Sequence, residues 1–233
     1  HYPGPSPLLG SLKHLLENQP EREQTETWSR IVRFSFDQRG KSRGILGDHA
    51  IALIDTVGRT GLSSLAPVLA NILENDNPEL VLATIAALVR LGTPNSTMSA
   101  EIILSRVQPQ CVESARSALT FAETGDLDIL TELFATSCCF LRLQILRLVE
   151  SILTRSTLAF SREPAWLLTL ATLLLRQLKD SKPSHFAGFI AAPLGLTLRH
   201  CGEPGIAAAL ATAPDLKKND RIEAFLNALL IAE

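Results

Sequence analysis

The chain has 233 residues, 46% of them hydrophobic and 20% charged, with a formal net charge of −2. This length and apolar content support a sizeable hydrophobic core and exclude wholesale disorder. The near balance of 22 basic and 24 acidic residues excludes the strongly positive field with which proteins attract nucleic acid or anionic membranes.

Residues 1–24 are expected to form a linker or N-terminal arm that is partly disordered, because the chain opens on Pro3, Gly4, Pro5 and Pro7. Residues 25–233 are expected to form a single domain. Since the first residue is His1 rather than Met, we expect an excised domain or a processed chain of a larger protein.

The first expected helix spans residues 26–36, and a polar loop, 37–44, separates it from a second helix at 49–61. Basic residues interleaved with Trp28 and Phe34 mark this region. They are Arg30, Arg33, Arg39, Lys41 and Arg43. Basic and aromatic side chains together can bind nucleic acid. Acidic residues just upstream, including Glu21 and Glu26, could neutralise the cluster, so a solvated surface is the preferred interpretation.

A repeat follows. Gly61, Gly92 and Gly125 each end an apolar helical pattern, and they lie roughly 30 residues apart, the length of one helix pair. The clearest unit is 65–92. Five apolar residues share one face of its first helix: Leu65, Val68, Leu69, Ile72 and Leu73. In its second helix, Asn77 is a predicted N-cap and Pro78 suits the first turn, while Gly92 supplies the stop.

This unit resembles the HEAT repeat, an armadillo-type helical repeat family. The resemblance depends on the turn 76–79 (Asp-Asn-Pro-Glu), the Ala-Ala-Leu stretch at 86–88 and the closing Leu91-Gly92. It implies an all-α fold: a right-handed α-solenoid of about six helix pairs, forming a curved superhelix whose second helices line the concave side.

Further helices are expected along the rest of the chain, with a looser period after Thr154. They span 101–107, 112–122, 127–134, 140–153, 164–179, 184–200, 204–212 and 219–232. The most apolar run, 165–175, would rise only about 16 Å as a helix, which is too short to cross a membrane. It therefore predicts a buried helix and no membrane span.

Signals for chemistry are sparse. The four cysteines, Cys111, Cys138, Cys139 and Cys201, lack the spacing of a disulfide framework or a metal site. We expect reduced, mostly buried thiols and a cytoplasmic or nuclear location. Asp126 and Asp128 are expected to cap the next helix rather than act as paired acids. No catalytic residue, metal or cofactor is expected.

The candidate partner-binding residues lie on the second helix of the 65–92 unit. Val81, Leu82 and Ala86 occupy positions where a HEAT helix usually exposes charge. Exposed apolar surface often marks an interface, so they are expected to form its floor. Arg59 and Arg90, one repeat apart, are expected to lie side by side as a charged edge for an acidic helix or peptide. In the alternative, a neighbouring helix or the long N-terminal segment covers the three apolar residues, and the two arginines are unrelated surface residues.

Together these features predict a non-catalytic scaffold or adaptor domain that binds other proteins. Two enzymes built on HEAT-like repeats are the rivals. An alkylpurine DNA glycosylase would need a basic groove rich in Trp and Tyr, whereas this chain has two tryptophans and one tyrosine. A lyase that attaches bilin chromophores stays open as an alternative, because its site is not a short motif.

Overall fold

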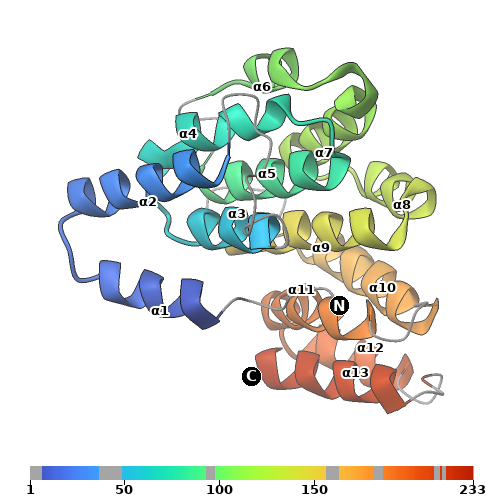
Figure 1. Cartoon of the computed structure of the whole chain (residues 1–233). Coiled ribbons are helices and arrows are strands. Elements are labelled where there is room, and N and C mark those ends of the chain that lie inside the picture. The colour runs from blue at the N-terminus through green and yellow to red at the C-terminus, as the bar shows by residue number, and fades with distance from the viewer. Residues whose placement is uncertain are drawn as a thin grey trace. The chain divides into compact units, whose positions relative to one another are not determined.

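The protein is described here by a computed structural model (Figure 1). The structure describes residues 7–36, 49–92, 98–155, 163–180, 186–212, 216 and 219–232. Within these ranges the chain is helical and contains no extended β-strand, which confirms the all-α prediction. Within the same ranges, no helix has both the length and the apolar character that a membrane span requires.

The chain divides into two compact units, His1–Leu119 and Thr120–Glu233, a finer division than the single domain expected for residues 25–233. The first unit contains α-helices and short 3-10 helices. They are α1 (Pro7–Leu16), α2 (Glu21–Ser35), α3 (Ala50–Gly58), η2 (Ser63–Leu65), α4 (Ala66–Ala70), η3 (Asn71–Glu74), α5 (Pro78–Arg90), α6 (Ala100–Arg106), η4 (Pro109–Cys111) and the start of α7 (Val112–Thr124).

Helix α5 is the centre of the first unit. It packs against α3 on one side and against α4 and η3 on the other, as Figure 1 shows. Its start follows the predicted capping, since Asn77 Oδ1 accepts a hydrogen bond from the Glu79 amide at 2.9 Å. Its end follows the predicted stop, because Gly92 has a φ of 100° that other residues rarely adopt.

Part of the N-terminal segment, which is expected to form a linker or arm, is helical. Residues 7–16 form α1, which buries Leu9 and Leu16 and packs against α3. The proline-rich start predicts a linker or an N-terminal arm that is partly disordered. However, the apolar residues that follow Pro7 repeat at helical spacing and give a helix with a buried face. Residues 1–6 lie outside the described part of the chain.

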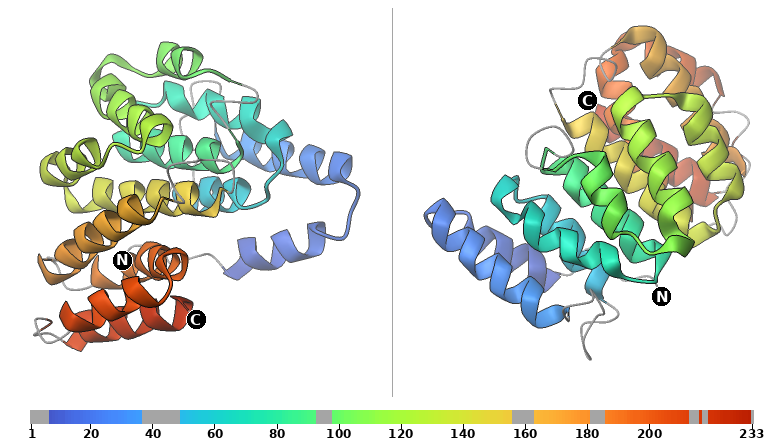
Figure 2. Two further views of the ribbon diagram at one scale, coloured as in Figure 1. Left: turned by 180° about the vertical axis from the view of Figure 1, so that it is seen from behind. Right: turned by 90° about the horizontal axis from the view of Figure 1, so that it is seen from above.

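The second unit contains the end of α7 and six further described helices. They are α8 (Leu127–Thr136), α9 (Cys139–Thr154), α10 (Pro164–Asp180), α11 (Ala187–Cys201), α12 (Glu203–Thr212) and α13 (Asn219–Ala232). Helix α11 packs against α9, α10 and α13. In Figure 2, α13 is the red helix that lies alongside α11. The indole Nε1 of Trp166 donates a hydrogen bond to the Gly125 carbonyl at 2.6 Å, which ties the start of α10 to the α7–α8 turn.

Candidate functional site

The apolar residues expected to form an exposed partner site are buried. Val81 is 1% exposed, and Leu82 and Ala86 are each 3% exposed. The expectation that these side chains face solvent is therefore wrong. Apolar residues stand on nearly every side of α5, and a helix with that pattern is surrounded by neighbours rather than half-solvated.

The structure brings Arg59 and Arg90 together around a residue that the sequence analysis did not single out. Asp55 accepts a hydrogen bond from Arg59 Nε at 2.9 Å, and its other carboxylate oxygen lies 3.5 Å from Arg90 Nη1. Because a carboxylate already lies between the two arginines, they do not present an unopposed cationic edge to an acidic partner. The pairing of Asp55 with Arg59 was predictable from the sequence, because oppositely charged residues four positions apart are neighbours on a helix surface.

The basic region at residues 30–43 is only partly described. Trp28 is fully buried and cannot stack on a base, whereas Phe34 is exposed. Arg30 pairs with Glu26, one of the upstream acids expected to neutralise the cluster. Arg39, Lys41 and Arg43 lie outside the described residues.

The four thiols are free, but only Cys111 is buried. Cys138 is exposed, and Cys139 and Cys201 are half-buried, so the expectation of mostly buried thiols is wrong. Burial raises the pKa of Cys111, helped by the negative charge of Asp76, and burial also raises the pKa of Cys201. Among the described residues, no three metal-binding side chains gather into one group. Asp126 caps α8 by accepting a hydrogen bond from the Asp128 amide at 2.9 Å, as predicted.

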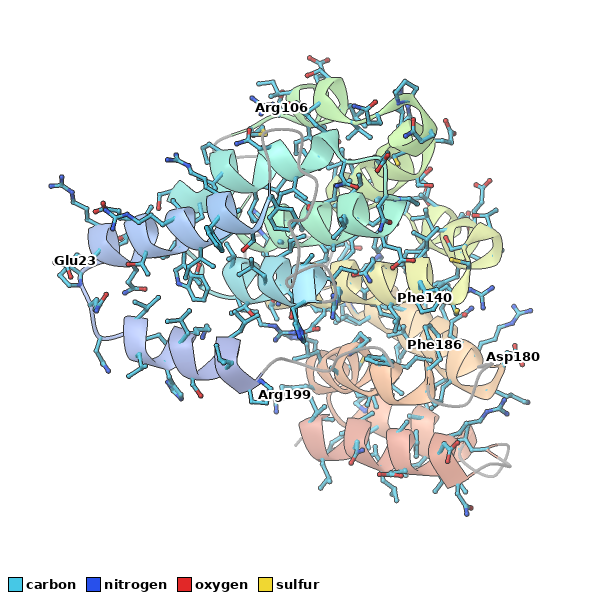
Figure 3. The ribbon with its side chains drawn as sticks, in the orientation of Figure 1. Glu23, Arg106, Phe140, Asp180, Phe186 and Arg199 are labelled. Atoms are coloured by element: carbon cyan, nitrogen blue, oxygen red, sulfur yellow. The ribbon has the colours of Figure 1, made fainter. Side chains whose placement is uncertain are left out.

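The second unit contains a better candidate for a binding surface, the outer face of α10, which has exposed side chains beside two hollows. Four of its residues follow one another at intervals of four and form a row along the helix. They are Leu168, Thr172, Arg176 and Asp180, and all four are exposed. The row begins on an apolar side chain, since Leu168 is 39% exposed. It ends at Asp180, labelled in Figure 3 at the C-terminus of α10. These same four residues line two hollows, one with α12 and one with α8 and α9.

The hollow between α10 and α12 has a volume of about 530 Å³ and is mainly apolar. Its buried lining includes Ala171, Ala209 and Leu216, while Ala208 on its wall is exposed. Because buried lining and exposed rim occur together, it is an open groove rather than an enclosed cavity. Arg176, Lys179 and Asp180 stand at its charged end.

The second hollow lies on the α8 side of the row and has a volume of about 680 Å³. Phe134 and Ala135 of α8 and Leu173 of α10 supply apolar lining. Arg142 of α9 also lines it, and its Nε donates a hydrogen bond to the Ser137 carbonyl at 3.0 Å, which fixes the side chain near the start of α9.

The described residues that line the two hollows carry more positive than negative charge. Among the described lining residues of the two hollows, Arg142, Arg176 and Lys179 are cationic and Asp180 is acidic. The chain as a whole has a net charge of −2, so this positive character is local. The α10 surface is thus defined by an exposed row, a hollow on each side and a charged end at which Arg176 and Lys179 stand beside Asp180.

The sequence analysis missed this surface because the run at 165–175 predicts a helix that is simply buried. Helix α10 does bury Leu167, Leu170 and Leu174, yet it exposes the row on its other side. The four-residue spacing from Leu168 to Asp180 was a usable signal of that exposed face. The hollows were not predictable, since their other walls come from α8, α9 and α12.

Comparisons of the chain with protein-family models, with curated proteins and with solved structures find no match.

Proposed function

We propose that this chain is a non-catalytic protein-interaction module that binds an amphipathic helix of a partner protein across α10. The observation that carries the proposal is the exposed row from Leu168 to Asp180 with a hollow on each side. Amphipathic helices are commonly recognised by laying their apolar face into such grooves. The proposal keeps the expected scaffold or adaptor role but moves the partner site from α5 to α10.

The geometry of the row favours a helix over an extended peptide. Residues spaced by four form a ridge on a helix surface, and helices pack by fitting the ridges of one into the grooves of the other. Here the ridge of α10 already has a groove on each side. Leu168 and Asp180 are twelve residues apart on the helix, so the ridge is about 18 Å long and can contact roughly three turns of a partner helix.

The charge of the lining favours an acidic partner. Arg176 borders both hollows, Lys179 borders one and Arg142 the other. Guanidinium groups pair with carboxylates in two-point geometry, which fixes the register of a bound segment. Leu168, at the other end of the ridge, supplies apolar contact. The partner is therefore a helix with an apolar stripe and carboxylates placed to meet Arg176.

We also propose that the helices belong to a HEAT-like α-solenoid, the architecture implied by the repeat resemblance. Supporting this, Gly61, Gly92 and Gly125 all have positive φ values, of 73°, 100° and 70°, and each follows within three residues of a helix end, as Gly202 does after α11 with a φ of 65°. The α4–η3 segment followed by α5 also gives the helix pair expected for 65–92. Arrays of this kind present extended binding surfaces.

The proposal is tested with two synthetic helical peptides of 18 residues that share one leucine stripe and differ only in flanking Glu or Lys. We expect the intact chain to bind the acidic peptide at least about tenfold more tightly, a difference of ~1.4 kcal/mol. Arg176→Glu is expected to reverse the preference. Fluorescence anisotropy of labelled peptides at low and high salt measures both effects, and salt should weaken the acidic complex.

Arg116→Glu is the matched control, because Arg116 is an exposed arginine on α7 that lines neither hollow. Both variants are expected to keep the melting temperature of the wild type, since exposed charges tolerate substitution. If Arg116→Glu alters binding as much as Arg176→Glu, binding reflects general charge and the α10 site is wrong. If neither peptide binds, the proposed function is wrong.

A further inference from the structure

We infer that the hollow between α10 and α12 is an anchor pocket for one bulky aromatic side chain, Trp or Phe, projecting from the acidic partner helix. The inference rests on the proposed function for the identity of the partner, but the pocket itself can be probed separately. The inference specifies which residue of the partner contributes most to affinity and which pocket of this chain holds that residue.

The shape of the hollow is the first reason. Four of its lining residues are small, and three leucines also line it, yet about 530 Å³ stays open. The small residues are Ala171, Gly205, Ala208 and Ala209, and the leucines are Leu168, Leu175 and Leu216. That volume falls within the range of pockets that hold ligands, roughly 300–1,000 Å³. The hollow on the α8 side is different, because Phe134 already contributes an aromatic ring to its lining.

Gly205, one of the small lining residues, is required by the contact between α12 and α11. A Cβ atom at this position would lie 2.2 Å from the Cβ of Cys201 and 3.1 Å from its sulfur. Glycine is thus required for the first turn of α12 to lie against the end of α11. A larger residue at 205 would push α12 away, so the small wall is part of the packing between these two helices.

The charged rim is the reason to choose an aromatic occupant over an aliphatic one. Two cationic side chains, Arg176 and Lys179, stand with Asp180 at the charged end of this mainly apolar hollow. Cations are attracted to the face of an aromatic ring, most strongly to that of Trp. An aliphatic side chain would gain only apolar burial there. Buried aromatic anchors in desolvated pockets commonly account for most of the affinity of an interface.

The first experiment probes the pocket without any partner. Alanine methyl groups of the intact chain are isotopically labelled, and 3-methylindole is titrated to millimolar concentration while protein NMR spectra are recorded. We expect the methyl signals of Ala208 and Ala209 to shift with saturation and that of Ala207 to stay largely unchanged. Absence of a saturable shift at Ala209 would overturn the inference.

The chain offers a matched pair of variants for the second experiment. Ala207 and Ala208 are adjacent exposed residues of α12, but only Ala208 lines the hollow. Ala208→Leu should fill the pocket and Ala207→Leu should not. Both should melt within a few degrees of the wild type, because exposed substitutions change stability little.

Each variant is tested against the acidic helical peptide with Trp or Ala at the centre of its apolar stripe. For the wild type and Ala207→Leu, we expect the Trp peptide to bind about tenfold more tightly or better. In Ala208→Leu this advantage should fall at least fivefold, while the Ala peptide binds as before.

The outcomes separate the two proposals. Equal affinity of the Trp and Ala peptides for the wild type, or a full Trp advantage in Ala208→Leu, would overturn the anchor pocket and leave the proposed function intact. Saturable binding of 3-methylindole at Ala209 with no binding of either acidic peptide would support the pocket and show that the helix-binding function is wrong.

Discussion

Leu82 shows how a single side chain can mislead when only its neighbours in sequence are known. The resemblance to the HEAT repeat predicts a charge at this position, so an apolar residue there indicates either an exposed interface or a covering neighbour. The structure gives the second result, with Leu82 only 3% exposed. The absence of charge at Val81 and Ala86 follows from the same burial. Deciding between the two outcomes required knowing where other helices lie.

Burial at Leu82 gives a stability prediction opposite to that of an exposed site. Leu82→Glu places a carboxylate in an apolar environment, and we expect it to lower the free energy of unfolding by about 3 kcal/mol or more. Leu226→Glu on α13 is the control, because Leu226 is 53% exposed. We expect that change to cost less than about 0.5 kcal/mol. Urea unfolding followed by circular dichroism measures both, and equal losses would contradict the burial of Leu82.

At the scale of one element, local sequence predicts helices well and their surroundings poorly. The N-cap at Asn77 and the stop at Gly92 depend on residues close in sequence, and both were predicted. The two faces of α10 depend on contacts with α8, α11 and α12, so a run of apolar residues could not show which side would stay exposed. The candidate site was therefore harder to predict than the helix that carries it.

Helix α11 provides an internal comparison of two glycines. A Cβ atom at Gly195 would lie 2.7 Å from the Ala228 carbonyl oxygen and 2.6 Å from the Cβ of Ile231, both on α13, whereas one at Gly188 would meet nothing within 4 Å. We expect Gly195→Ala to destabilise the protein by about 1–3 kcal/mol through overpacking. Gly188→Ala should stabilise it by up to about 1 kcal/mol, because alanine loses less backbone entropy in a helix.

Thermal or urea unfolding of the two variants beside the wild type measures this difference. A gain in stability for Gly195→Ala would show that α11 and α13 do not approach as closely as the structure places them. A loss for Gly188→Ala would show that this position contacts other groups.

At the scale of the whole molecule, the two compact units have separate centres. In the first, α5 packs with α3, α4 and η3, and in the second, α11 packs with α9, α10 and α13. Helix α7 passes from one unit into the other. Proteins can open locally, in cooperative units that often coincide with compact groups of packed elements. A destabilising substitution in one centre should therefore increase local opening mainly within its own unit.

Hydrogen exchange read by mass spectrometry tests this division with one variant for each unit. Leu88 is fully buried on α5, and Leu88→Asp should speed amide exchange in α3 and α5 by about tenfold or more, because a buried charge favours local opening. The same variant should leave α11 and α13 within about twofold of the wild type. Gly195→Ala should give the reverse pattern, with faster exchange in α11 and α13 and little change in α3 and α5. Uniform acceleration along the chain in both variants would show one cooperative folding unit, and the division at Leu119 would then have no energetic meaning.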